Sequence, residues 1–105
     1  MSADPIHAPN EVIHQSVRLK IMSALNALPR TESLDFARLK AITGATDGNL
    51  GAHLNTLEQA GYVKIDKDFV GKKPRTTAII TASGRSAFEN HVAYLRDILD
   101  NISSS

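Results

Sequence analysis

Apolar residues first recur at helical spacing in the stretch from about Asn10 to Pro29. They fall every three or four residues, which places them on one face of a helix. Asn10 has the side chain of an N-cap, and Pro29 ends the helix because proline cannot continue it. We therefore expect one continuous helix between these two residues. Its apolar face consists of Val17, Ile21, Leu25 and Leu28.

Two shorter helices follow, and each begins at a capping residue and stops at a glycine. Leu34 is expected to form a very short strand, and Asp35 caps a helix that ends at Gly44. Thr46 caps the next helix, which stops at Gly61. The apolar seam of this third helix consists of Leu50, Leu54 and Leu57.

The residues after this helix alternate between apolar and polar, which is the period of a β-strand. The first strand is expected over Tyr62 to Phe69, although Lys67 breaks the inward pattern and indicates that this end leaves the core. Thr76 to Thr81 is rich in β-branched residues and is expected to be the returning strand. Gly71 to Pro74 forms the tip between the two strands.

A long final helix is expected over residues 82–102, with Thr81 as its cap. Its apolar residues repeat at intervals of three and four for about two heptads, a pattern typical of helices that pack on one another. We expect this seam to form a dimer interface between two copies of the chain. Residues 1–9 are expected to be a flexible arm and residues 103–105 a disordered tail. The predicted interface consists of Phe88, Val92, Leu95, Leu99 and Ile102.

The composition indicates one ordinary globular domain, which we place at residues 10–102. The chain has 105 residues, of which 42% are hydrophobic and 22% charged, and its net charge is only +1. It has no cysteine, which excludes disulfides and thiolate metal sites and favours a cytoplasmic location. The sequence has neither a membrane-spanning apolar run nor the features of a signal peptide, so we expect no membrane partner. The order of elements predicts a mainly α fold with a small β-hairpin, an α+β class.

The second and third helices have the arrangement of a helix-turn-helix unit, because a four-residue turn with a glycine joins them. In such units the second helix enters the DNA major groove. The face opposite the leucine seam is small, rich in amides and uncharged, and amides can pair with adenine. A solvated face is the alternative, but such faces favour Glu and Lys, and two glycines cost a helix about 1 kcal/mol each. The predicted base-reading residues are Gly48, Asn49, Ala52, Asn55 and Thr56.

The hairpin concentrates positive charge that the chain as a whole lacks. Residues 64–75 contain five basic and two acidic residues, so their local net charge is +3. Cations at a hairpin tip can hold the DNA backbone, although a solvated basic tip is the alternative. Arg38 and Lys40 on the second helix are equally open to phosphate contact and to solvation. The predicted backbone-contacting residues are Thr46, Lys64, Lys72, Lys73, Arg75 and Thr76.

Other chemistry finds little support in the sequence. The histidines are scattered, without the spacing of metal ligands, so we expect no metal and no cofactor. His53 lies at the edge of the leucine seam and is interpreted as a partly buried structural residue. Arg18 is expected to form a structural ion pair, with Asp35 or Glu58. No phosphate-binding glycine loop, nucleophile grouping or carboxylate cluster indicates an enzyme. The four histidines are His7, His14, His53 and His91.

Four stretches together resemble the short MarR-like winged-helix transcriptional regulators, and also the ArsR type. They are residues 47–54, 57–63, 69–76 and 80–85, and residues 17–22 and 34–39 are similar to that family's first two helices. The resemblance implies a homodimeric DNA-binding regulator with a recognition helix at about 46–60 and a wing at about 62–81. It also implies dimerisation through the terminal helix at about 82–102. The chain is short for a full-length MarR protein and lacks the helical length that builds an effector pocket there, so an effector ligand is left open.

The leading hypothesis is a sequence-specific transcriptional regulator that binds double-stranded DNA as a homodimer, with the third helix in the major groove. Its two recognition helices should then lie about 34 Å apart, to meet successive major grooves. The alternative is a winged-helix module for protein–protein interaction, in which the fold is kept without specific DNA binding.

Overall fold

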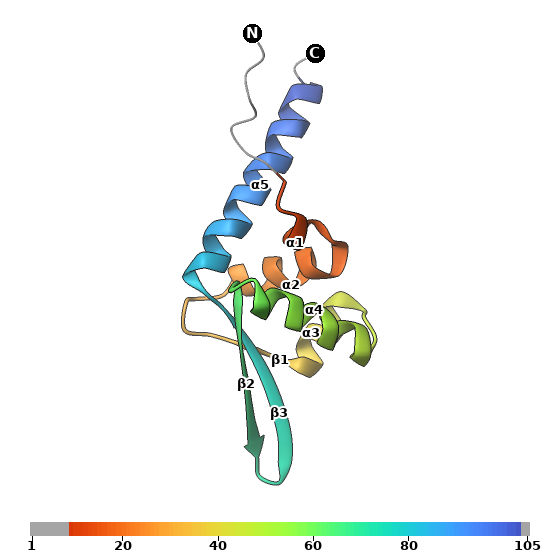
Figure 1. Cartoon of the computed structure of the whole chain (residues 1–105), viewed down its shortest axis with the longest axis vertical. Coiled ribbons are helices and arrows are strands. Elements are labelled where there is room, and N and C mark those ends of the chain that lie inside the picture. Colours follow the sequence, from red (N-terminus) through yellow and green to blue (C-terminus); the bar gives the residue numbers. More distant parts are fainter. Residues whose placement is uncertain (1–8, 104–105) are drawn as a thin grey trace.

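The computed structural model describes residues 9–103, and it has the element order expected from the sequence (Figure 1). A compact group of helices lies at the centre, with a long hairpin extending from one side and the terminal helix from the other. The class is therefore α+β, as predicted. The elements are α1 (Glu11–His14), α2 (Ser16–Asn26), β1 (Leu34–Asp35), α3 (Phe36–Thr43), α4 (Asp47–Gln59), β2 (Val63–Val70), β3 (Lys73–Ile80) and α5 (Ala82–Ser103).

The core forms where α2, α3, α4 and the base of the sheet meet. The leucine seam of α4 is buried as predicted, with Leu50 and Leu57 fully enclosed and Leu54 only 3% exposed. Each such side chain contributes roughly 2 kcal/mol through burial. This burial fixes which face of α4 remains outside. The other core residues are Ile13, Ile21, Met22, Leu25, Leu39, Val63, Ala78, Ile80 and Phe88.

The expected single N-terminal helix is divided into two, so that prediction is wrong. Gln15 has an extended backbone, with φ −65° and ψ 135°, and its side chain accepts a hydrogen bond from the Arg18 N–H. The break leaves the Val12 carbonyl outside a helical ladder, and the Arg18 Nε–H donates to it. Helix α2 also ends at Asn26, three residues before Pro29. Apolar spacing alone did not reveal the break because α1 and α2 both bury apolar residues in the same core.

The predicted caps of the helix-turn-helix unit are confirmed. The Asp35 side chain accepts a hydrogen bond from the Arg38 N–H at 2.8 Å, and Thr46 accepts one from the Asn49 N–H at 3.2 Å. Gly44 ends α3 in the left-handed region, with φ 70°. These local bonds satisfy backbone groups that would otherwise be orphaned at helix ends. They define where α3 and α4 begin and where α3 ends.

The sheet is antiparallel, with the order β1-β3-β2, and the predicted short strand at Leu34 is confirmed. Strand β3 begins at Lys73, three residues earlier than expected, so Pro74 lies in the strand and only Gly71 and Lys72 form the turn. Gly71 has φ 64°, which suits a tight hairpin turn. Proline is tolerated because this part of the hairpin projects from the body (Figure 1).

Helix α5 begins where the hairpin returns to the body and extends away from it (Figure 1). The predicted cap is confirmed, since the Thr81 hydroxyl accepts a hydrogen bond from the Gly84 N–H at 2.9 Å. The expected tail is partly wrong, because Ser103 is the last residue of α5. The rest of that tail and most of the predicted N-terminal arm lie outside the described residues. None of the helices formed by residues 9–103 is long and apolar enough to cross a membrane.

Candidate nucleic-acid interface

The outer face of α4 is exposed and carries no charge over its central positions. Gly48, Asn49, Ala52 and Asn55 are all exposed, and they lie opposite the buried leucine seam. Thr56 is half-buried, and its hydroxyl donates to the Ala52 carbonyl at 3.1 Å. The Thr56 oxygen can therefore accept from a ligand more readily than it can donate. The structure thus brings all five predicted base-reading residues onto or beside one accessible helix face.

An ion pair closes the turn between α3 and α4. Lys40 Nζ lies 2.7 Å from Asp47 Oδ1, and both side chains are about half exposed or more. The pair places the Asp47 carboxylate at the N-terminus of α4, where a negative charge is favourable. It also neutralises that carboxylate, which would otherwise repel a phosphate. Lys40 is thus occupied by an internal partner rather than presented to a phosphate.

The two faces of the wing, which comprises β2, β3 and the turn between them, are chemically different. Lys67 and its register partner Thr76 line a hollow of about 210 Å³ together with Gly51 and Asn55 of α4. Side chains alternate along a strand, so Lys64 lies on the opposite face, away from α4. The predicted backbone contact of Lys64 is therefore on the less favourable face.

Sequence reasoning did not select Lys67 as a site residue. It treated this lysine as an interruption of the apolar alternation. The alternation of side chains along the strand could have revealed this position. Val63 and Ile65 face inward, and Lys67 lies on the same face of the strand, toward α4. Lys67 is therefore a cation that the wing places beside the outer face of α4.

The cations at the wing tip are unequal. Lys72 and Lys73 are exposed, and within residues 9–103 neither is paired with a carboxylate. Arg75 instead binds its cross-strand partner Asp68 through two bonds, of 3.0 and 2.7 Å. The hydrogen bond from Arg75 lowers the pKa of Asp68, and the same bond raises the pKa of Arg75. Arg75 therefore has to share or release Asp68 before its guanidinium can bind a phosphate.

Arg18 and His53 connect α2 to the inner edge of α4. The expected ion pair of Arg18 is wrong, because its guanidinium donates to His53 Nδ1 at 3.0 Å in addition to the Val12 carbonyl. Burial, and then the charge of Arg18, lower the pKa of His53. A neutral His53 is required for it to accept this bond. Both residues are structural, as expected, although by a different contact.

The structure brings two of the scattered histidines together. His91 is fully buried, and its Nδ1 accepts a hydrogen bond from the Asn10 N–H at 3.1 Å, while its Nε2 lies 3.3 Å from His14 Nδ1. Burial, and then the neighbouring His14, lower the pKa of His91. Tyr94 stacks on the His91 ring, with centroids 5.8 Å apart. Among the described residues no group of three or more His, Cys, Asp or Glu could hold a metal ion. The cluster therefore links α1 and its N-cap Asn10 to α5.

The apolar seam of α5 is divided between two environments. Phe88 is 9% exposed and belongs to the core, and Val92 packs against that core. Phe88 therefore offers little surface to a second copy, and its predicted place in a dimer interface stays a prediction. Leu99 and Ile102 lie further along the helix and are 62% and 68% exposed. The surface that a second copy could use is the distal half of α5.

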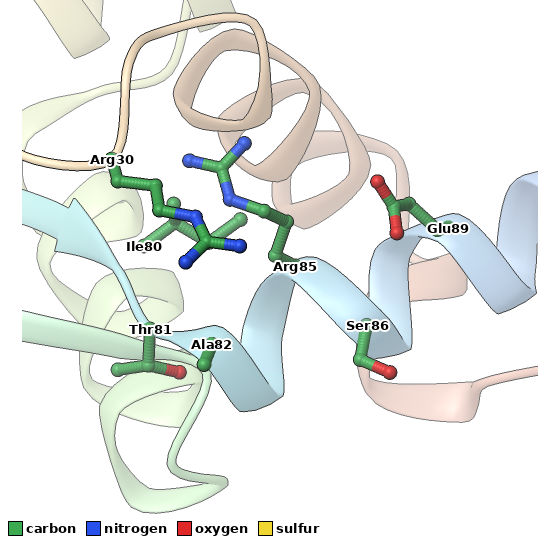
Figure 2. A pocket seen from close by; sticks show the side chains of 7 residues that line it. All are labelled: Arg30, Ile80, Thr81, Ala82, Arg85, Ser86 and Glu89. Atoms are coloured by element: carbon green, nitrogen blue, oxygen red, sulfur yellow. The ribbon is translucent and has the colours of Figure 1, made fainter.

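A larger hollow, of about 430 Å³, lies at the start of α5 on another part of the molecule (Figure 2). Arg85 points from α5 to the end of α2, where it donates to the carbonyls of Asn26 and Leu28 at 2.9 and 3.3 Å. These carbonyls lie at or beyond the last turn of α2 and lack helical partners. Arg30 extends across Ile80 on the same side (Figure 2). The principal role of Arg85 is thus to attach α2 to α5.

Comparison with known proteins agrees with this geometry. Residues 17–99 match the family described as winged helix DNA-binding domain. The chain is 35% identical over 92 residues to an uncharacterized protein of Methanocaldococcus jannaschii, and the alignment covers 88% of this chain and 97% of that protein.

Solved structures of transcriptional regulators have the same fold. The transcriptional regulator homologue from Pyrococcus horikoshii OT3 has a TM-score of 0.78 and 28% identity, with 89% of each chain covered. A MarR-family regulator from Silicibacter pomeroyi has a TM-score of 0.65 at 18% identity, with 87% of this chain and 58% of that chain covered. The predicted winged-helix resemblance is confirmed, and the chain belongs to the winged helix DNA-binding domain family.

Proposed function

We propose that this protein is a cytoplasmic, sequence-specific transcriptional regulator that binds double-stranded DNA as a homodimer. The observation that carries the proposal is the outer face of α4, which is exposed, small and uncharged and lies beside Lys67 of the wing. A groove-reading helix needs polar groups that can pair with bases and a backbone contact that fixes its register. The hollow between α4 and the wing is lined by both kinds of group, since Asn55 of α4 can pair with a base and Lys67 of the wing can bind a phosphate.

The residues of α4 have separable roles in this proposal. Asn49 and Asn55 would pair with adenine edges, since an amide can donate and accept at the same time. Gly48 and Ala52 would let the helix backbone approach the base pairs closely. The Thr56 oxygen would accept from a base amino group, because its own proton is used by the Ala52 carbonyl.

Backbone contacts would come mainly from the wing. Lys72 and Lys73 at the tip and Lys67 on the inner face are exposed cations that can reach phosphates. Thr46 and Thr76 would add hydroxyl contacts near the start of α4 and on the wing. Arg75 would contribute less, because Asp68 already holds it.

The homodimer would form through the distal half of α5. Leu99 and Ile102 continue the heptad-like seam and are largely exposed, and Leu95 is half-buried before them. Helices with such a seam bury it against one another. A two-fold axis there would present two copies of α4 to one face of the DNA, about 34 Å apart.

Selection of duplexes from a random pool tests specific binding, and fluorescence anisotropy on the selected site then gives affinity across a salt series. The variant Lys72→Gln/Lys73→Gln should bind more weakly and with a shallower salt dependence, by about 0.9 in log–log slope for each lost phosphate contact. Lys20→Gln on α2 removes the same kind of charge from another exposed helix and should leave the slope unchanged. An unaltered slope in the tip variant means that the wing does not hold the backbone.

A protein-interaction module is the second candidate. The observation in its favour is the pairing of Lys40 and Arg75 with carboxylates, which leaves fewer unpaired cations near α4 and the wing to bind phosphates. Under this alternative the selected pool would show no enrichment, and binding would not distinguish one duplex from another.

A further inference from the structure

The tip of the wing carries two large apolar side chains that the fold leaves in solvent. Phe69 is 70% exposed and Val70 is 56% exposed, whereas Val63 at the base of the same strand is 3% exposed. These tip residues add little to the core, because the strand has already left it. Both side chains are therefore accessible to a binding partner, and lysines lie next to them in the chain.

Strand alternation separates the two residues. Phe69 shares its face with Lys67, which lines the hollow against α4, and its cross-strand partner is Pro74. Val70 lies on the opposite face, with Asp68. The wing therefore presents an apolar end, made of Phe69 and Pro74, on the same side as the outer face of the recognition helix.

The surroundings of Phe69 suit a polyanion with an apolar interior. Lys67 precedes it on the same face and Lys72 follows it in the turn, while Lys73 at the start of β3 pairs with Val70 on the other face. The minor groove of duplex DNA has phosphates along both rims and sugars and base edges between them. An acidic protein surface would match the lysines alone. The minor groove matches both the lysines and the aromatic ring, because its phosphates and its apolar surface lie within a few ångströms of each other.

The wing is long enough to reach such a groove. The five residues from Asp66 to Val70 are all exposed, and at about 3.3 Å per residue they extend roughly 16 Å. Figure 1 shows the hairpin projecting from the helical body past the end that holds α3 and α4. With α4 in a major groove, the tip can cross the intervening backbone to the adjacent minor groove, which is about 6 Å wide.

We propose that Phe69 is a minor-groove wedge, whose ring enters a base step beside the site read by α4, partly unstacks it and bends the duplex. This inference rests on the proposed DNA-binding function and adds a source of specificity to it. Insertion of an apolar side chain kinks DNA toward the major groove, and flexible TA or CA/TG steps resist this least. Selected sites should therefore contain such a step at a fixed distance from the bases read by α4.

The test compares Phe69→Ala with Val70→Ala on the selected duplex. The latter removes an exposed apolar side chain from the same hairpin but from the other face. Phe69→Ala should bind about tenfold more weakly. Its salt slope should stay unchanged, because a phenyl ring displaces no counterions. Val70→Ala should stay within about twofold of the wild type, and thermal melting should show that both variants remain folded.

Two further measurements report the wedge directly. Energy transfer between dyes at the duplex ends should show a bend with the wild-type protein and a smaller bend with Phe69→Ala. A 2-aminopurine placed at the flexible step should brighten on binding of the wild type only. Phe69→Leu, which keeps an apolar wedge, should retain most of the bend.

Failure of the wedge and failure of the proposed function give different results. If the wild type enriches no duplex, the proposed function is wrong and the wedge falls with it. If the wild type binds its site but Phe69→Ala binds and bends it equally, only the wedge is wrong and the proposed function stands. A loss of affinity without any bend or unstacking in the wild type also overturns the wedge.

Discussion

Replacing Gly48 by alanine should stabilise the fold and weaken DNA binding at the same time. A Cβ added at Gly48 meets no heavy atom within 4 Å, and its backbone φ lies outside the left-handed region that favours glycine. Alanine therefore fits without strain. It should stabilise α4 by up to about 1 kcal/mol, which corresponds to a rise in Tm of roughly 4–8 °C for a domain of this size.

The unfavourable effect of Gly48→Ala should appear as a lower affinity for DNA. Gly48 lies in the first turn of α4, on the exposed face opposite Leu50, where a recognition helix approaches the bases most closely. A methyl group forced into a close interface costs about 1–3 kcal/mol, or roughly 5- to 150-fold in affinity, and a dimer carries two copies. Binding to the selected duplex by anisotropy measures this loss, and calorimetry of the free protein measures the gain in stability.

The matched control is Ser86→Ala on α5, at an exposed helical position away from α4. It should stabilise by a few tenths of a kcal/mol, about the difference in helix propensity, and leave DNA affinity unchanged. If Gly48→Ala raises Tm but binds the selected duplex as tightly as the wild type, the assignment of this face to the groove is refuted. A lower Tm would instead refute the premise that alanine fits at position 48 without strain.

Three other perturbations test contacts of the structure. Gly84→Ala should destabilise the fold by about 2 kcal/mol or more, because its Cβ would overlap the Tyr62 carbonyl, and a fall in Tm measured by calorimetry checks this. Asp68→Asn should release Arg75 for phosphate and raise DNA affinity at low salt; an affinity equal to that of the wild type across the salt series would contradict the idea that Asp68 withholds Arg75. Stability should fall as pH drops below about 6.5, since the pKa values of His53 and His91 are lowered in the folded state. The unfolded chain then binds protons that the folded chain rejects. The Tm of wild type measured between pH 7.5 and 5.5 should therefore fall more steeply than that of His91→Gln, which keeps an acceptor for the Asn10 N–H but cannot be protonated.

Local hydrogen bonds and backbone preferences made the helix-turn-helix unit predictable from the sequence. Asp35, Thr46 and Thr81 cap their helices through bonds to residues only three positions away. Gly44 and Gly71 sit where the backbone needs a left-handed residue. The leucine seam of α4 repeats at the helical period, so its burial and the exposure of the opposite face both followed from spacing. These features depend only on residues that lie close together along the chain, so a single sequence is enough to predict them.

Tertiary structure decided which polar and charged residues are free to act. Lys67 rather than Lys64 faces α4, because strand parity matters only once β2 is placed against that helix. Arg75 is held by Asp68 through the hairpin register, and Arg75 lies in a strand because β3 begins at Lys73, earlier than expected. His91 is buried against Asn10, more than 80 positions earlier in the chain.

The sequence by itself thus determined the helix-turn-helix unit, the hairpin, the terminal helix, the caps of α3, α4 and α5 and the face of α4 that stays outside, because periodicity and local hydrogen bonds specify those. It did not determine the break at Gln15, nor that Phe88 lies in the core of its own protomer. Those outcomes depend on which surfaces meet when distant segments pack together. An apolar residue has the same signature in the sequence whether it is buried inside its own protomer or exposed to a partner, and only the packed structure distinguishes the two.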